Sequence, residues 1–346
     1  MIGSDQLIEK LLQTLSVFED IQLRLDPPRF AEYQSRVKAI PDFTQLADNL
    51  RAIELPEAQA FAQRQLLKAA AQVAKGKETF LAADQSRVGL MSAFRSLRFF
   101  CRAYEALYPL APFYKNIEDF FSAAGKDPAE KPKPAAADGI PRGIMDFGND
   151  RNARGGYTLY VPEYYSPETE WPLIVALHGG SGHGADFFWS WLKTARARGA
   201  ILLAPSSLEN TWSMHIPTAD GRAMLKMVNT TIGNYKIDPQ RMLITGISDG
   251  GTFSLMLTAS AMNIFSHTAA VACAGHAFTQ QAKQFAQKKI YLVHGGRDWM
   301  FPVAPVRTAA ATLQAAGADI IYREIADLSH NYPGDENARI MDWFLA

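Results

Sequence analysis

Short apolar runs alternate with helical stretches over residues 143–346, and this alternation constrains the fold of the 346-residue chain more than any other feature. Runs that are apolar throughout are typical of strands covered on both faces, and strands separated by helices form a mostly parallel sheet wrapped by helices. The expected strands are Tyr157–Val161, Leu173–Leu177, Ala200–Ala204, Arg241–Thr245, Ala269–Ala272, Ile290–Val293 and Ile320–Ile325. The expected helices are Ala185–Ala197, Gly221–Asn234, Gly250–Ser260, Val306–Ala315 and Asn337–Phe344.

The first 125 residues follow a different period. Apolar residues recur at three- and four-residue steps from Leu7 to Leu25, which draws one stripe along a helix that ends before Pro27. Further helices are expected over Glu57–Ala74, Ser86–Tyr108 and Phe113–Phe121. Residues 126–142 are rich in proline and poor in large apolar side chains, as in a linker. We therefore expect an all-helical domain of unknown role over 1–125, a linker over 126–142 and an α/β domain over 143–346.

The charge and cysteine content excludes some functions. Lys plus Arg and Asp plus Glu both number 35, so no basic excess is present to neutralise nucleic-acid phosphates. The two cysteines, Cys101 and Cys273, fall in different expected domains, which favours two buried free thiols over a disulfide.

The N-terminus has no signal-peptide pattern, and no apolar stretch reaches the length of a membrane span. We expect a cytoplasmic protein.

The segment Gly246-Ile247-Ser248-Asp249-Gly250 fits the pattern G-x-S-x-G. An apolar strand precedes it and a helix follows, which is the context of a nucleophile elbow, where a serine sits on a sharp turn. Its glycines allow close packing, and the helix N-terminus favours negative charge. The alternative is an ordinary glycine-rich turn. The context favours Ser248 as a nucleophile.

A strand that ends in His178-Gly179-Gly180 lies upstream. Loops of this kind supply one backbone N–H of an oxyanion hole, and the residue after the nucleophile supplies the other. The expected donors are the N–H groups of Gly180 and Asp249. A phosphate-cradling loop is the alternative, but the segment has neither P-loop nor G-x-G-x-x-G spacing.

The acid and the base are expected after the nucleophile, in that order. Asp298 follows the strand Ile290–Val293 and precedes Trp299, and its alternative is a surface-loop aspartate. His330 follows the last expected strand and precedes the last helix, where the base belongs. The other histidines are less well placed, and His294 is expected to be a packed core histidine.

Together these residues resemble the α/β-hydrolase superfamily. They are most similar to its small carboxylesterase branch, which includes phospholipase/carboxylesterases, dienelactone-hydrolase-like proteins and feruloyl or polyhydroxyalkanoate-type esterases. The resemblance rests on Leu177–Gly180, Gly246–Gly251, Gly295–Asp298 with Phe301-Pro302, Ser329-His330 and Ile237–Arg241. The chain departs from the branch at Asp249, where Gln, His or Met is commoner, and at Phe301, where Val is usual.

The resemblance implies an α/β-hydrolase fold and a serine carboxylesterase that cleaves short-chain or aromatic acyl esters through Ser248, His330 and Asp298 by way of an acyl-enzyme. The implied substrate is a small ester, and no metal or organic cofactor is needed. A thioesterase or a peptidase/amidase would use the same residues. A non-catalytic hydrolase-fold scaffold, whose helical domain recruits a partner, is an alternative of another class.

Two further features remain open. Trp299 and Trp212 are candidates to line a substrate pocket, and core packing is the alternative for both, favoured for Trp212. The helical domain is a candidate for self-association into a homo-oligomer or for covering the active site.

Overall fold

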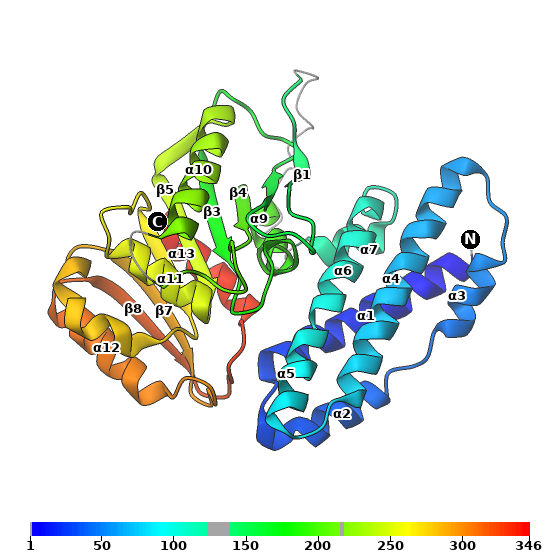
Figure 1. Cartoon of the computed structure of the whole chain (residues 1–346). Coiled ribbons are helices and arrows are strands. Elements are labelled where there is room, and N and C mark those ends of the chain that lie inside the picture. The colour runs from blue at the N-terminus through cyan, green and yellow to red at the C-terminus, as the bar shows by residue number, and fades with distance from the viewer. Residues whose placement is uncertain (1, 123–138, 215–217) are drawn as a thin grey trace. The chain divides into compact units, whose positions relative to one another are not determined.

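The computed structural model describes residues 2–122, 139–214 and 218–346. The chain divides into two compact units, Met1–Ala123 and Ala124–Ala346, which are drawn together in Figure 1. The expected linker over 126–142 lies outside the described residues as far as residue 138.

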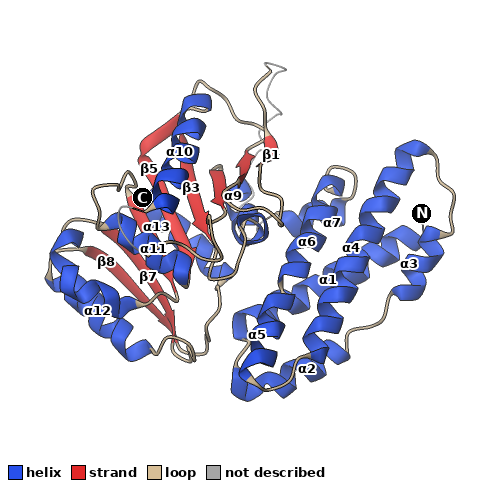
Figure 2. Ribbon diagram, in the orientation of Figure 1, coloured by secondary structure: helices blue, strands red, loops and turns tan. Residues whose placement is uncertain are grey.

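The first unit contains only helices and loops in its described part (Figure 2). Its helices are α1 (Ile2–Arg24), η1 (Pro27–Arg29), α2 (Phe30–Lys38), α3 (Thr44–Arg51), α4 (Glu57–Ala82), α5 (Arg87–Ser96), α6 (Arg98–Leu107), η2 (Tyr108–Leu110) and α7 (Lys115–Phe121). The apolar stripe of α1 is buried, and the Phe18 ring stacks on that of Phe100 of α6 with 3.8 Å between centroids. Phe80 of α4 meets Phe18 edge-on at 5.9 Å. The apolar period of α1 thus packs it against α4 and α6.

The helix expected over Ser86–Tyr108 is two helices. The N–H of Leu97 bonds to the carbonyl of Phe94, three residues back, and this tighter turn separates α5 from α6. The expected helix Ala185–Ala197 is likewise two helices, α8 (Gly184–Phe187) and α9 (Trp189–Arg198), which meet at Phe188. The spacing of apolar residues along the sequence does not reveal where one helix ends and the next begins in a new direction.

The second unit is built on an eight-stranded sheet with the order β1-β2-β4-β3-β5-β6-β7-β8. The strands are β1 (Gly143–Phe147), β2 (Tyr157–Val161), β3 (Trp171–Leu177), β4 (Ile201–Pro205), β5 (Ile237–Ile247), β6 (His267–Val271), β7 (Lys289–Gly295) and β8 (Asp319–Ile325). β2 pairs antiparallel with β1 and β4, and all the other pairs are parallel. The sheet is therefore mostly parallel, as the apolar runs predict.

Helices cover both faces of this sheet. Every residue of β3 is buried, as a strand covered on both sides must be. Figure 1 shows α10 (Ala219–Asn234) and α11 (Asp249–Thr258) on the viewer's side and α13 (Asn337–Leu345) behind the strands. α13 is fastened to α9, because Asn337 Nδ2 donates to the carbonyl of Ser190 at 2.8 Å. α12 (Val303–Ala315) contributes Val306 and Leu313 to the core near β7.

The edge strand β1 was not expected from the sequence. Its residues are half-buried or exposed, and it pairs with β2 alone, so its sequence carries no run of buried side chains. Phe147 and Tyr157, which are opposite each other in the register, stack their rings at 4.7 Å. This ring contact stabilises the pairing of β1 with β2, and the apolar pattern of the sequence does not indicate it.

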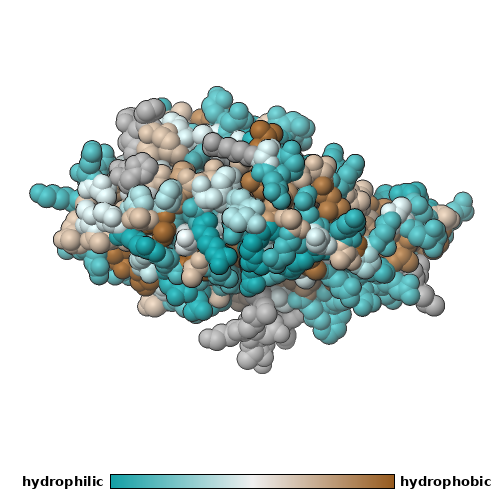
Figure 3. Space-filling model, turned by 90° about the horizontal axis from the view of Figure 1, so that it is seen from below, coloured by the Kyte–Doolittle hydropathy of each residue, from teal (hydrophilic) through white to brown (hydrophobic). Residues whose placement is uncertain are grey.

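The described surface carries few large exposed apolar side chains. On the face drawn in Figure 3, hydrophobic residues form small separate patches among hydrophilic ones. Val88 and Phe113, both in the helical unit, are 80% and 75% exposed. Among the described residues, no helix is both long enough and apolar enough to cross a membrane.

Candidate active site

Ser248 stands on a strained turn between β5 and α11. Its backbone has φ 55° and ψ −117°, a conformation that non-glycine residues rarely adopt and that is held only where the surroundings enforce it. The surroundings here are two hydrogen bonds: the Ser248 N–H donates to the Val271 carbonyl at 2.8 Å, and the Thr252 N–H donates to the Ser248 carbonyl at 2.9 Å. The turn lifts the Ser248 hydroxyl to the carboxyl edge of the parallel strands.

His330 lies within hydrogen-bond distance of that hydroxyl. Its Nε2 is 3.0 Å from Ser248 Oγ, and its Nδ1 is 2.8 Å from Asp298 Oδ2. Nδ1 must donate to the carboxylate, so Nε2 carries the lone pair and accepts from the serine hydroxyl. His330 is 8% exposed and Asp298 is 7% exposed, so the chain of hydrogen bonds runs through a largely dry environment.

Asp298 is held by its own loop. Its Oδ1 accepts the N–H groups of Met300 at 2.9 Å and Phe301 at 2.7 Å, which leaves Oδ2 to face His330. The two backbone donors fix the orientation of the carboxylate. The Phe301 ring meets the His330 imidazole edge-on, with 5.2 Å between centroids, and packs against it.

The loops after β7 and β8 are tied to each other. The Arg297 N–H donates to the Leu328 carbonyl at 3.0 Å, and the Gly296 N–H donates to the Ile325 carbonyl at 2.9 Å. These bonds set Asp298 on one loop against His330 on the other. The 32-residue separation of acid and base along the chain is thus closed by strand pairing and two backbone bonds.

The combination of strand order, elbow and residue order decides the fold. The sheet has an antiparallel edge, and β4 lies between β2 and β3 in its strand order. Ser248, Asp298 and His330 follow β5, β7 and β8, respectively, and are joined by hydrogen bonds. Together these features are those of an α/β-hydrolase fold. Residues 143–346 have the α/β-hydrolase fold. The helical unit before it is not part of that fold.

Comparisons with known proteins find partial sequence similarity to esterases. No model of a known protein family matches the chain. A segment is 30% identical over 145 residues to feruloyl esterase B of Neurospora crassa, covering 39% of this chain and 49% of that protein. Another alignment is 28% identical over 142 residues to a poly(3-hydroxybutyrate) depolymerase of Ralstonia pickettii, covering 35% and 29%. The chain thus spans half or less of the length of these relatives.

The comparison with solved structures includes the following match. An esterase of the Planctomycetes species Thermogutta terrifontis, solved with butyrate bound, superposes with a TM-score of 0.47 at 14% identity. The match covers 59% of this chain and 93% of that one.

The expected oxyanion donors of this α/β-hydrolase unit lie next to each other. The Asp249 N–H belongs to the first turn of α11, where backbone donors have no partner within the helix. A Cβ placed on Gly180 would come within 2.6 Å of Asp249 Oδ2, so the two residues are in contact and a side chain at 180 would displace the Asp249 carboxylate. Gly179 approaches Ser248 as well, because a Cβ there would lie 3.5 Å from Ser248 Cβ.

Two of the rival histidines, His178 and His183, have hydrogen-bond partners other than Ser248. His178 Nδ1 donates to the Gly179 carbonyl at 2.7 Å, and its Nε2 accepts from the Ser207 N–H at 3.1 Å. Burial lowers the pKa of His178 to about 3, against the opposing effect of the bond to Gly179, so the ring is neutral. His183 caps α8 by accepting from the Ala185 N–H at 3.2 Å. His215 lies outside the described residues.

The two candidate pocket tryptophans are placed differently. Trp212 is 2% exposed, its ring stacks on Phe253 at 5.2 Å, and its Nε1 donates to the His178 carbonyl at 2.7 Å. Trp212 is therefore a core residue, which is the alternative that the sequence favoured, and it is no longer a pocket candidate; it supports the loop that contains His178 and Gly180. Trp299 is half-buried beside Asp298 and stays a candidate.

Two residues contact the candidate site although the sequence analysis gave them no role there. Thr211 is one, and its Oγ1 donates to Asp249 Oδ2 at 2.5 Å. His294 is the other. It is a fully buried histidine, as expected, yet its Nε2 donates to the Phe301 carbonyl at 2.8 Å and lies 3.4 Å from Asp298 Oδ2. Neither residue belongs to a motif, and only the fold brings them to the site.

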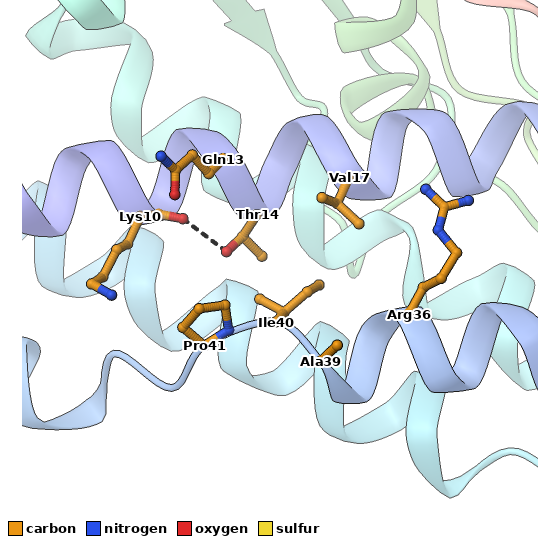
Figure 4. Close-up of a pocket in the computed structure, with 8 residues that line it drawn as sticks. All are labelled: Lys10, Gln13, Thr14, Val17, Arg36, Ala39, Ile40 and Pro41. Atoms are coloured by element: carbon orange, nitrogen blue, oxygen red, sulfur yellow. Dashed lines mark hydrogen bonds between the residues drawn. The ribbon is translucent and has the colours of Figure 1, made fainter.

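A hollow of about 370 Å³ lies in the helical unit between α1 and the end of α2 (Figure 4). Its lining is Lys10, Gln13, Thr14, Val17, Arg36, Ala39, Ile40 and Pro41. The Thr14 hydroxyl donates to the Lys10 carbonyl of its own helix, and Arg36 is paired with Asp20 at 2.6 Å. The Thr14 hydroxyl and the Arg36 guanidinium thus already have partners within the helical unit, so we assign the hollow no chemistry. Among the described residues, no cluster of three His, Cys, Asp or Glu side chains could hold a metal ion.

Proposed function

We propose that the α/β-hydrolase unit is a serine carboxylesterase that cleaves short-chain or aromatic acyl esters. The observation that carries the proposal is the hydrogen-bond chain from Ser248 Oγ through His330 to Asp298, with distances of 3.0 and 2.8 Å, at a strained elbow. A serine hydroxyl is a weak nucleophile unless an adjacent base takes its proton, and that base must hold one tautomer. The distances from His330 to Ser248 and to Asp298 support both conditions.

In the first step, Ser248 Oγ attacks the ester carbonyl while His330 Nε2 takes its proton. The carbonyl oxygen becomes an oxyanion, which the N–H groups of Gly180 and Asp249 stabilise. Asp298 keeps the Nδ1–H tautomer and stabilises the imidazolium that forms. His330 then gives its proton to the leaving alkoxide, and the C–O bond of the ester breaks, which leaves an acyl-Ser248.

In the second step, water attacks the acyl-enzyme. His330 takes a proton from the water, a second oxyanion forms in the same hole, and its collapse releases the carboxylic acid. The proton returns from His330 to Ser248 Oγ, so the enzyme is regenerated. Every proton transfer uses His330 Nε2, so this sequence of steps needs no cofactor.

The relatives support an ester over other acyl bonds. The two relatives are named as a feruloyl esterase and a poly(3-hydroxybutyrate) depolymerase. The first name denotes an aromatic acyl substrate and the second a short hydroxyacyl substrate. We carry over the ester bond and the size range of the acyl group. Because half or more of each relative lies outside the match, the leaving group is left open.

The test is hydrolysis of p-nitrophenyl esters from acetate to decanoate, together with methyl ferulate, by wild type and Ser248→Ala. Ser35→Ala, an exposed serine in the helical unit, is the matched control. We expect turnover by wild type and Ser35→Ala, best on short or aromatic acyl groups, and loss of at least about 1000-fold in Ser248→Ala. Cleavage of only thioesters or amides would move the assignment to a thioesterase or peptidase, and an inert wild type would favour a scaffold.

A further inference from the structure

The side chain of Asp249 connects the two proposed oxyanion donors. Its backbone N–H is one donor, while its carboxylate extends to Gly180, which carries the other. Oδ2 lies 2.6 Å from where a Gly180 Cβ would be, so the carboxylate fills the space that the missing side chain leaves. Asp249 therefore contacts Gly180 through its side chain, in addition to supplying a backbone donor of its own.

Thr211 fixes that carboxylate. Its Oγ1 donates to Asp249 Oδ2 at 2.5 Å, and it comes from the segment between β4 and α10, which is distant in sequence from both donors. A hydrogen bond from a hydroxyl to a carboxylate is charge-assisted and stronger than a neutral one. It joins a third segment of chain to the elbow.

The segment that carries Thr211 is also hydrogen-bonded to the loop around Gly180, on both sides of that residue. Before Gly180, the Trp212 Nε1–H donates to the His178 carbonyl at 2.7 Å. After Gly180, the Ser181 N–H donates to the Asn210 carbonyl at 2.8 Å. Thr211 lies between Asn210 and Trp212 in the chain. The three consecutive residues therefore make three hydrogen bonds that hold the two proposed donor segments together: two to the loop around Gly180 and one to Asp249.

We propose that Thr211 and the Asp249 side chain are a positioning pair, which sets the separation of the Gly180 and Asp249 N–H groups for the oxyanion. The proposal rests on the proposed function. Oxyanion donors act only when they are pre-set about 2.7–3.1 Å from where the charge develops, and a misplacement of about 1 Å can cost 100-fold in rate. Thr211 touches no reacting atom; it acts through Asp249.

A positioning pair and a plain structural contact have different kinetic signatures. The ground-state ester carries little charge on its carbonyl oxygen, whereas the tetrahedral intermediate carries a full negative charge. Loss of the pair therefore lowers kcat and leaves KM nearly unchanged. It also weakens binding of a trifluoromethyl ketone, which forms an anionic adduct with the serine, more than binding of a matched methyl ketone.

The experiment uses the full chain with Thr211→Val, which keeps the shape and removes the donor, and Thr211→Ser, which keeps the donor. Asp249→Ala and the Thr211→Val/Asp249→Ala double variant complete a cycle. The matched control is Thr230→Val, an exposed α10 threonine that donates to the Lys226 carbonyl of its own helix. Each variant is assayed for kcat and KM on the best ester and for inhibition by both ketones.

We expect Thr211→Val to lower kcat about tenfold, to change KM less than about twofold, and to weaken the trifluoromethyl ketone by a similar tenfold factor. Thr211→Ser should recover most of the loss, and the double variant should be no slower than Asp249→Ala. The proposal is overturned if Thr211→Val turns over within twofold of wild type, if it raises KM alone, or if Thr230→Val loses as much. Failure of the proposed function is separate, because it shows as an inert wild type.

Discussion

His294 and Phe301 are joined by a hydrogen bond of 2.8 Å from the imidazole Nε2–H to the backbone carbonyl, and the His294 side chain is completely buried. Phe301 in turn donates its N–H to Asp298 Oδ1 and places its ring on His330. A histidine that belongs to no motif thereby holds the loop that places Asp298 against His330.

Removal of this bond should impair both stability and turnover. We expect His294→Leu to lower the free energy of unfolding by about 1–3 kcal/mol, because the Phe301 carbonyl loses its donor. It should also lower kcat, because the Asp298 loop is no longer held. Urea unfolding and ester turnover measure the two effects. His267→Leu is the control: His267 is buried at the start of β6, away from the catalytic edge, and should lose stability only. Equal kcat losses in both variants would contradict a positioning role for His294.

Asp298→Asn should be folded but nearly inactive. The two backbone donors at Oδ1 will keep the amide oxygen of the new side chain, so its NH₂ must face His330. That arrangement forces Nδ1 to accept and Nε2 to carry the proton, and the imidazole then cannot take the Ser248 proton. We expect kcat to fall by about 1000- to 10,000-fold with an unchanged melting curve. Activity within tenfold of wild type would mean that Asp298 is not the orienting acid.

Two glycine-to-alanine variants should change stability in opposite directions. A Cβ on Gly250 would lie 2.5 Å from the carbonyl oxygens of Leu177 and His178, so Gly250→Ala forces backbone apart and should cost about 1–3 kcal/mol. Gly233, inside α10, has nothing within 4 Å of that position, and Gly233→Ala should gain about 0.4–1 kcal/mol. Chemical denaturation of both variants measures the pair. Equal effects would show that the elbow tolerates a side chain at 250.

His178 should make the protein less stable in acid. Its folded pKa is lowered to about 3 by burial, and its Nε2 must stay unprotonated to accept from Ser207. Below its unfolded pKa of about 6.5, the unfolded chain binds a proton that the folded ring refuses. Stability should therefore be complete above that pH and fall toward pH 3, by up to about 1.4 kcal/mol per pH unit from this residue.

Urea unfolding at several pH values between 8 and 4 measures this dependence. His178→Gln should be less stable at pH 8, since the buried contacts are altered, but should lose less stability on acidification than wild type. The same slope in both proteins would assign the acid sensitivity to other groups.

The sequence predicted seven of the strands and the places of Ser248, Asp298 and His330, because these depend on local patterns. Apolar runs buried on both faces mark β3 and β5 directly, and glycines around Ser248 mark a turn whose geometry they alone permit. The edge strand β1 was missed because only one side of it is paired and its side chains are half exposed.

The supports of the site could not be predicted in the same way. The Thr211–Asp249 bond spans 38 residues, and the His294–Phe301 bond depends on how the loop after β7 folds back. An isolated threonine or histidine has no periodic signal that distinguishes it from a core residue. Trp212, a pocket candidate for which core packing was the favoured alternative, packs in the core and donates to the His178 carbonyl.

The most direct test of the central claim is covalent labelling by a fluorophosphonate, which reacts only with an activated serine. Wild type and Ser248→Ala are treated side by side, and the adduct is located by peptide mass spectrometry. We predict one adduct per chain, on the peptide that contains Ser248, and none in Ser248→Ala. An adduct at another serine, or equal labelling of both proteins, would contradict the assignment of Ser248 as the nucleophile.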